Sequence, residues 1–466
     1  MKILKKIALG ASTALLASTA MPLLAQDREA PPEPTEARPF ALPELTEFEL
    51  SNGIDVTLVP YGKTPQVTIL ASVQTGNIDE GQNVWLADLT GDMMEKGAGG
   101  RDASQIAEMA ANMGGGLSLG VGPDQVTAYT GVLSEHAANA VRLIADVLVR
   151  PDFPAAELDK VKADMLRNLS VAKSTPSGMA QEAFAGVMYP DHPYGRFFPT
   201  QDQVTGYTLD QVRAFHAENF GAERTRVYVV GQFDEAAVRA ALEESFGNWK
   251  AGKPATELAS PPVDGKDVVL VDRPGAPQST LRIGQRVDVP MDDIEFDAAN
   301  TLLGGYFSSR ITRNIREDKG YTYSPGSSLS QNVHGSGWAE YADVTAEATG
   351  PSIVEILKEV RRMQAEPPTD AELQGIKNYM NGTFVIGLAS RNGVASQLAS
   401  LDILGLGPDY LNTYVERVSA LTGADLQRAT AKNLAIDDMT YVVVGPLETV
   451  RPQLEAVPEL SGRLPE

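Results

Sequence analysis

Two pairs of residues have the spacing that local chemistry needs. Asp88 and Asp92 are four positions apart on a predicted helix over residues 84–95, so their carboxylates share one face. Such oxygen ligands suit a hard cation, but Ca²⁺ takes about six or more of them and a straight helix supplies few. Ser170 and Lys173 match S-x-x-K, yet the chain contains neither S-D-N nor K-T-G. We interpret these pairs as a solvated acidic face and a chance match.

Histidine, cysteine and glycine add no local catalytic or metal motif. The chain has no cysteine, which excludes disulfides, thiolate metal sites and thiol catalysis. Its histidines never share ligand spacing on one helix. His136 and His216 lie on predicted helices and are interpreted as ordinary polar positions, and His192 lies in a predicted turn. The glycine run 114–116 follows a helix and precedes a strand, the reverse of a phosphate loop, and predicts a helix end.

The charge balance limits the classes of molecule that the protein is expected to bind. The 466 residues include 39 Lys and Arg against 61 Asp and Glu, a formal net charge of −22 at pH 7. Such a surface repels phosphate backbones and anionic lipid, so nucleic acid is not expected as a partner. The same charge could steer basic peptides toward the protein or serve solubility alone.

The first 25 residues have the pattern of a secretory signal peptide. Three lysines precede a charge-free stretch over residues 7–25, and Ala20 or Ala25 could be the last residue removed. The alternative is an uncleaved anchor, since 19 uncharged residues could just span a bilayer. Pro22 and the many Ala, Ser and Thr residues argue against it. We expect a periplasmic or otherwise secreted protein with no stable membrane insertion.

The rest of the chain contains a mixture of predicted strands and predicted helices. Residues 26–43, with five prolines, predict a disordered arm. Alternation over residues 48–59, interrupted by Ser51-Asn52-Gly53, predicts a β-hairpin. The proline-containing stretch 250–266 predicts a linker between domains at 44–249 and 267–460. Further strands are predicted at 67–73 and 226–231, and helices at 84–95, 103–113, 134–149, 155–174, 209–219 and 235–246.

The second half of the chain repeats the first. PQVTI at residues 65–69 recurs as PQSTL at 277–281, and VYVVG at 227–231 recurs as YVVVG at 441–445. Together with the pairs Thr208/Thr422 and Asn219/Asn433, these matches occur in order at offsets of 212 to 214 residues. A period of this length indicates a duplicated domain, because solenoid repeats are far shorter. We predict two similar α+β domains, each a mixed or antiparallel sheet with packed helices.

Three stretches of the sequence carry a resemblance to one family. Residues 75–129 resemble the N-terminal domain of the pitrilysin-like metallopeptidases, which include the mitochondrial processing peptidases and the core proteins of respiratory complexes. Residues 192–234 and 307–329 are also typical of this family, and the resemblance covers most of residues 44–456. Active members carry the inverted zinc signature H-x-x-E-H, in which the histidines bind zinc and the glutamate activates water.

The signature is degenerate in this chain. Aligning Met93–Gly97 with the apolar pair and the lysine-glycine that follow the signature places Asp88, Gly91 and Asp92 on its three positions. The family's further glutamate ligand has no counterpart, because residues 167–170 contain no carboxylate. The resemblance therefore implies that this chain binds no zinc or other cofactor and is not an independent peptidase.

The other half of the family's catalytic apparatus is present. REDKGYTY at residues 316–323 resembles the R-E-x-x-G-x-x-Y element, whose arginine and tyrosine face the zinc across the cleft in active members. A guanidinium grips a carbonyl or carboxylate, and a phenol stabilises an oxyanion. The resemblance implies substrate-binding roles for Arg316 and Tyr323. Without it, the same residues describe an exposed helix end, with Lys319 near the C-terminus and Gly320 as the stop.

The resemblance implies a complementing subunit, since some members work as pairs of chains. A homologous partner would supply H-x-x-E-H and its zinc, and this chain would supply Arg316, Tyr323 and half of a chamber for peptide substrates. The alternative is a non-enzymatic scaffold or peptide-binding protein that retains the peptidase fold. A carboxylate-based hydrolase that uses Asp88 and Asp92 is a third possibility, but it lacks a base and ligands.

Overall fold

The computed structural model describes residues 40–258, 260 and 265–465. The predicted signal peptide and residues 26–39 of the predicted arm lie outside the described residues. In the described part of the chain, no helix is both long enough and apolar enough to cross a membrane. The described residues of the predicted linker form neither helix nor strand, and Arg224 donates hydrogen bonds to the carbonyls of Lys253 and Pro254 within it.

The N-terminal half contains a six-stranded sheet with the order β1-β2-β8-β3-β7-β6. The predicted hairpin is confirmed, since Phe48 in β1 pairs with Val56 in β2 across a turn in which Gly53 has φ +91°. β2 and β8 are parallel, and the other neighbours are antiparallel. The strands are β1 Thr46–Glu49, β2 Asp55–Pro60, β3 Gln66–Val73, β6 Leu117–Val121, β7 Val126–Leu133 and β8 Thr225–Gly231, with a separate small pair, β4 Gly97–Ala98 and β5 Arg101–Asp102.

The C-terminal half contains the matching sheet, with the order β11-β12-β10-β13-β9. β9 runs parallel to β13 as β2 runs parallel to β8, and β10 lies between two antiparallel neighbours as β3 does. The predicted duplication and α+β class are therefore confirmed. The strands are β9 Val268–Asp272, β10 Gln278–Val287, β11 Gly326–Asn332, β12 Gly335–Thr345 and β13 Thr440–Gly445.

The helices repeat in the same way. Thr208 and Thr422, which the sequence pairs at an offset of 214, both close capping boxes at helix starts. The N-terminal helices are α1 Leu86–Met94, α2 Ala103–Asn112, α3 Ala137–Val149, α4 Ala155–Ser174, α5 Pro176–Met188, α6 Gln201–Gly206, α7 Leu209–Asn219 and α8 Glu235–Phe246. The C-terminal helices are α9 Ile294–Asn300, α10 Thr349–Ala365, α11 Asp370–Gly387, α12 Arg391–Ile403, α13 Asp409–Ala420, α14 Gly423–Asn433 and α15 Leu447–Glu455.

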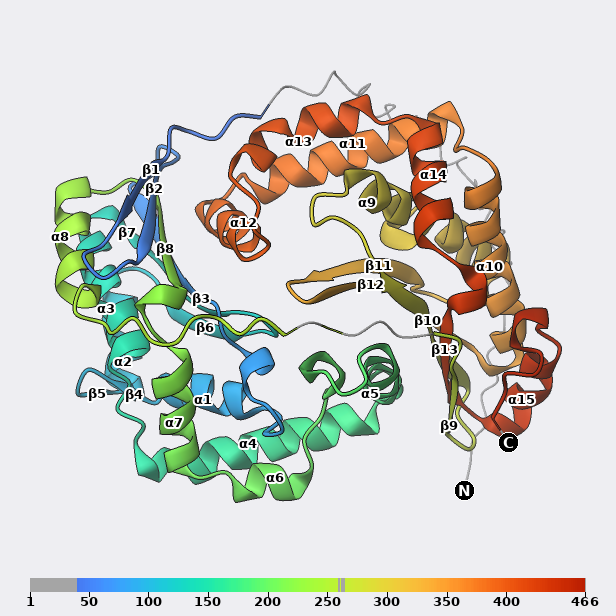
Figure 1. Cartoon of the computed structure of the whole chain (residues 1–466), viewed down its shortest axis with the longest axis horizontal. Coiled ribbons are helices and arrows are strands. Elements are labelled where there is room, and N and C mark those ends of the chain that lie inside the picture. Colours follow the sequence, from blue (N-terminus) through green and yellow to red (C-terminus); the bar gives the residue numbers. More distant parts are fainter. Residues whose placement is uncertain (1–39, 259, 261–264, 466) are drawn as a thin grey trace, which may run out of the picture. The chain divides into compact units, whose positions relative to one another are not determined.

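Each sheet is covered on one face by its own helices and on the other by a helix of the opposite half. In the N-terminal half, α3 and α8 pack together over the main core (Figure 1). The other face of that sheet, with Tyr228 and Val230, is covered by Val394 and Leu398 of α12. Reciprocally, α5 covers the strands β10 and β13 of the C-terminal sheet. The two halves are therefore interlocked.

Truncating the exchanged helix tests this packing. Leu398 is buried in the cluster between α12 and the N-terminal sheet. We expect Leu398→Ala to lower the free energy of unfolding by about 2–4 kcal/mol, because it removes buried methyl groups and leaves a cavity. Urea denaturation measures the loss. Val354→Ala is the control, since Val354 is exposed on α10 and its truncation should change stability by less than about 0.5 kcal/mol. Equal effects of the two substitutions would contradict the exchange.

Candidate functional site

The degenerate motif lies on α1, as the sequence predicts, with both aspartates on one side of the helix. Asp88 accepts a hydrogen bond from the Asn77 side chain, with 2.8 Å between Nδ2 and Oδ2. Burial raises the pKa of Asp88. Asp92 is exposed, and partial desolvation raises its pKa; the positive charge of Lys96 opposes this rise, and the negative charges of Asp88 and Asp164 add to it. Asp88 thus has a neutral hydrogen-bond donor in Asn77, and Asp92 lies close to the positive charge of Lys96.

The position of the family's catalytic glutamate is closed. Gly91 faces the edge strand β6, and a Cβ atom there would lie 2.6 Å from Val121 Cγ2 and 2.9 Å from Leu119 Cδ2. Both separations are too short for ordinary contact, so any side chain at residue 91 would displace its neighbours. The helix and strand have therefore packed together through the space that a glutamate would need.

The residues present do not fit a zinc site of the family's type. No group of three or more His, Cys, Asp or Glu side chains within the described residues could hold a metal ion. α4, which packs against α1, has no carboxylate at residues 167–170, and its Asp164 is bonded to Arg167. Two aspartates without imidazole or thiolate are a poor donor set for zinc. We therefore derive no catalytic step through a metal on this chain.

A buried carboxyl that the sequence analysis does not single out lies beside the motif. Glu80 is 5% exposed and accepts hydrogen bonds from the backbone N–H groups of Trp85 and Ala87 at 3.0 and 3.2 Å. Asn77 also donates to it, at 3.2 Å. Burial outweighs these hydrogen bonds and raises the pKa of Glu80 to about 7. The carboxylate lies just before the N-terminus of α1, where negative charge is favoured, and this was the one sequence signal for it.

A cavity of about 330 Å³ adjoins the motif. Its walls come from both halves: Asp88 and the loop before α1, helix α5 with the loop that follows it, and strands β10, β11 and β12. Arg282 of β10 lines it. Asp92, Arg316 and Tyr323 do not. Of the residues that the sequence singles out, Asp88 thus lines the cavity, and Arg316 and Tyr323 lie at a second site.

The second site consists of Arg316 and two aromatic rings. The guanidinium carbon of Arg316 lies 4.2 Å from the ring centroid of Phe307 and 5.0 Å from that of Tyr323. Phe307 is 66% exposed and Tyr323 79% exposed. Within the described residues, the Arg316 side chain forms no hydrogen bond or ion pair. The arginine is held by cation–π contacts while its donors remain available to a ligand.

Local backbone structure sets the positions of Arg316 and Tyr323. Arg316 lies in a π-helical segment, Thr312–Asp318, a rare conformation that occurs frequently at functional sites. Gly320, with φ +66°, ends the segment as the sequence predicts. Thr322 then donates a hydrogen bond from its hydroxyl to the Asp343 carbonyl of β12 at 2.6 Å, which fixes the chain directly before Tyr323.

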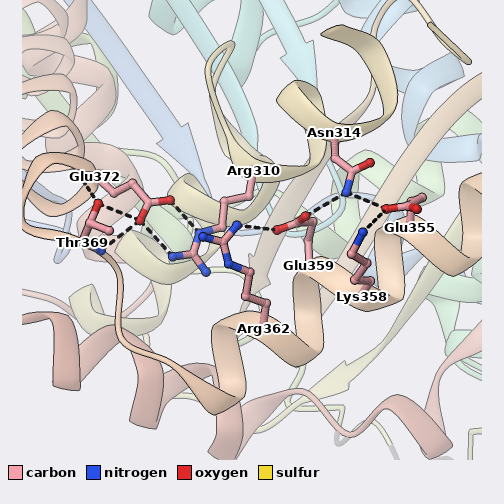
Figure 2. A network of polar contacts seen from close by, with 8 residues as sticks. All are labelled: Arg310, Asn314, Glu355, Lys358, Glu359, Arg362, Thr369 and Glu372. Carbon is pink, nitrogen blue, oxygen red and sulfur yellow. Dashed lines mark hydrogen bonds and ion pairs between the residues drawn. The ribbon is translucent and has the colours of Figure 1, made fainter. Parts of the chain in front are cut away.

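A polar network ties the π-helical segment to two neighbouring helices (Figure 2). Arg310, buried at the start of this region, forms a bidentate pair with Glu372 of α11 at 2.9 and 3.0 Å. Glu372 also closes the capping box of Thr369. Burial alone would raise the pKa of Glu372, but hydrogen bonds from Arg310 and Thr369 lower it to about 2. The pair therefore stays charged at neutral pH.

The next turn of the segment is bound to α10. Asn314 donates from Nδ2 to Glu355 and Glu359, each at 2.8 Å (Figure 2). Lys358 and Arg362 complete the network by pairing with the same two carboxylates. Because Arg310 and Asn314 are both anchored, the turn that carries Arg316 has little freedom to move.

His192 and His216 take structural roles through hydrogen bonds to the backbone. His216 lies on α7 with Nε2 2.8 Å from the Leu148 carbonyl, and burial lowers its pKa. His192 lies in the predicted turn, where Nδ1 accepts from the backbone N–H of Tyr194 at 3.2 Å. The Tyr194 hydroxyl in turn donates to Asp124 at 2.5 Å. These contacts hold the loop that forms one wall of the cavity.

Two family models match the chain. The model described as "Insulinase (Peptidase family M16)" matches residues 56–198. The model described as "Peptidase M16 inactive domain" matches residues 206–380. The two matched ranges include Asp88, Gly91 and Asp92 in the N-terminal half and Arg316 and Tyr323 in the C-terminal half.

Individual proteins and structures agree with these matches. The chain is 24% identical over 408 residues to "Uncharacterized zinc protease YmxG" of Bacillus subtilis, covering 86% of this chain and 98% of the relative. A crystal structure of a peptidase M16 inactive domain from Pseudomonas fluorescens superposes with a TM-score of 0.79 at 23% identity, covering 86% of this chain and 98% of that one. The periplasmic protease PqqL from Escherichia coli superposes with a TM-score of 0.75 at 17% identity. That match covers 95% of this chain and 49% of PqqL.

The close packing at Gly91 predicts that a glycine-to-alanine substitution has opposite effects on stability in α1 and in α11. In α1, Gly91→Ala should lower stability by about 1 kcal/mol, because an overpacking cost of about 1–3 kcal/mol exceeds the gain in helix propensity. In α11, a Cβ at Gly382 would meet nothing within 4 Å, so Gly382→Ala should raise stability by about 0.5–1 kcal/mol. Chemical denaturation of both variants measures the difference. A stabilising Gly91→Ala would show that α1 and β6 leave room for a side chain.

The raised pKa of Glu80 predicts a pH dependence of stability. The folded pKa of about 7 exceeds the ordinary value of 4.5, so the folded state binds the proton more tightly between these values. This contribution is complete below about pH 4.5 and is lost as the pH rises through 7. We expect the free energy of unfolding of the wild-type protein to fall by about 3 kcal/mol between pH 5 and pH 8 through this group. Glu80→Gln should not show this fall. Thermal melts of both proteins across that range provide the measurement, and parallel pH profiles would contradict the assignment.

Proposed function

The chain belongs to the M16 (insulinase) peptidase family, as the resemblance predicts, and we propose that it is the zinc-free subunit of an exported, heteromeric M16 peptidase. A homologous partner with an intact H-x-x-E-H motif would contribute the zinc and its bound water. This chain would contribute Arg316 and Tyr323 and one half of the enclosure around a peptide substrate. The names of the relatives, a zinc protease and a periplasmic protease, support the reaction class and the location.

The single observation that carries the proposal is the state of Arg316. Its guanidinium is stacked between Phe307 and Tyr323 and forms no ion pair within the described residues. Aromatic rings this exposed stabilise the fold little, but arginine and tyrosine are the side chains most enriched in the energetic centres of interfaces. The exposed rings and the guanidinium without an ion pair in the part of the chain that the structure describes support a role in binding a molecule outside this chain.

The chemistry of the two side chains suits amide hydrolysis at a neighbouring metal. The Arg316 guanidinium would bind and orient a substrate carbonyl or carboxylate through paired N–H donors. The Tyr323 hydroxyl would donate a hydrogen bond to the oxyanion that forms when the carbonyl is attacked. The partner's zinc would activate the attacking water. The close packing at Gly91 supports this division of labour, because a general base at this position would have to displace the side chains of Leu119 and Val121.

Closure of the motif also favours a second candidate, a scaffold or peptide-binding protein that retains the fold without taking part in catalysis. In that case the stacked arginine would serve only to bind the partner. The two candidates differ in what removal of the Arg316 side chain does to an assembled complex.

The test is peptide hydrolysis by this chain mixed with an H-x-x-E-H homologue from the same organism. We expect the purified chain alone to be inactive and the mixture to exceed the homologue alone. Arg316→Ala should lower kcat of the mixture about 100-fold or more, with the complex intact by size-exclusion chromatography, because misorientation of the substrate costs about that much in rate. Tyr323→Phe should also lower kcat of the mixture.

The matched control is Arg313→Ala, since Arg313 is exposed on the same π-helical segment, one turn before Arg316. It should leave both assembly and turnover unchanged. Full turnover by an assembled Arg316→Ala complex would instead establish the scaffold. Zinc-dependent hydrolysis by this chain alone would reject both candidates.

A further inference from the structure

The cavity beside the motif is built like a ligand site. Its volume of about 330 Å³ lies at the small end of the range for small-molecule pockets. One wall is apolar and comes from α5, through Phe184, Ala185 and Met188. Aromatic rings from the following loop and from the start of α1 extend this wall: Tyr189, Tyr194, Phe197 and Trp85. Such a surface would receive an apolar side chain of a ligand.

The opposite wall carries an arginine whose charge is poorly compensated. Arg282 projects into the cavity from β10, while its neighbours Leu281 and Ile283 face the core. Its Nε is buried without a hydrogen-bond partner, and no carboxylate lies within ion-pair distance among the described residues. Burial lowers the pKa of Arg282, which means that the folded chain stabilises its charge less well than water does.

The nearest acidic groups do not supply the missing anion. Glu340 is fully buried, and neither of its carboxylate oxygens has a hydrogen-bond partner within the described residues, so it does not bind the Arg282 guanidinium. Asp343 is already engaged by the Thr280 hydroxyl at 2.5 Å. A guanidinium in this position would gain most from a planar anion that accepts two hydrogen bonds.

Polar side chains complete the cavity. Ser328, Ser330 and Asn332 alternate along β11 and line the cavity on the same side as Arg282. Across from them, Asn77 and Asp88 line the wall that comes from the degenerate motif. The cavity therefore offers an apolar surface, a cation and several hydrogen-bonding groups within a space that holds one or two residues of a peptide.

We propose that this cavity binds a small carboxylate that bears an apolar or aromatic group, with the carboxylate on Arg282 and the apolar group against α5. The C-terminal end of a short peptide and a free aryl-substituted acid share this chemistry. The site uses neither Arg316 nor Tyr323 and needs no second chain. It is therefore separate from the proposed peptidase function, and either could fail without the other.

Calorimetric titration of the full chain tests the proposal with three probes. We expect saturable binding of the dipeptide Ala-Phe, and binding of Ala-Phe-amide that is weaker by about tenfold or more, because the amide lacks the anion. The third probe, 3-phenylpropionate, distinguishes the sources. Binding as tight as that of the dipeptide identifies a small acid as sufficient, and much weaker binding identifies the peptide C-terminus. Equal affinity for acid and amide, or no saturable binding of either acid, would overturn the proposal.

Variants locate the site within the chain. Arg282→Gln should weaken binding of the acids about tenfold or more without lowering the melting temperature, since it removes a poorly compensated charge. Ala339→Leu should also abolish binding, because the added carbons occupy the cavity. Arg142→Gln changes the net charge equally at an exposed surface pair and should leave binding unchanged. Wild-type affinity in both Arg282→Gln and Ala339→Leu would place the ligand elsewhere and reject the cavity.

Discussion

The fold depends on one constraint: each sheet has two apolar faces, and the helices of its own half cover only one. In β8, Val227 and Val229 point into the main core, while Tyr228 and Val230 face the other way and are equally buried. Continuous apolar strands of this kind need cover on both faces. The duplicated halves meet this need by exchange, with α12 on the N-terminal sheet and α5 on the C-terminal sheet. Neither half could bury its sheet alone.

The same exchange of helices positions both candidate sites. Because α5 crosses to the C-terminal sheet, it brings α1 and its degenerate motif to the same cavity as Arg282. On the other side, α11 leads into α12 and carries Glu372, which binds Arg310 at the start of the π-helical region. Packing between the halves thus reaches both the cavity and the turn that presents Arg316.

The sequence predicted well the elements whose boundaries depend on interactions between neighbouring residues. The boundaries of α4, α7 and α8 are predicted correctly, because caps and amphipathic periodicity are read from neighbouring residues. α5 is missed, since Gly178 and Gly186 interrupt an apolar segment that makes sense only against the other half's sheet. Glu80 and Arg282 were not found for the same reason, because their unusual electrostatics come from tertiary burial.

The degenerate motif and the Arg316–Tyr323 element contribute differently to the stability of the fold. At the motif, Gly91 packs closely on β6 and the neighbouring carboxyls are hydrogen-bonded within the chain, so this region is integrated into the core. At the second site, a guanidinium without an ion pair in the described residues lies between rings that are mostly exposed. A network that contains the buried Arg310–Glu372 pair holds that turn in place, and a buried ion pair stabilises a fold little more than apolar packing would. Rigid support beneath side chains that contribute little to folding is the arrangement expected of a preorganised binding site, and this is the physical ground for the role proposed for Arg316.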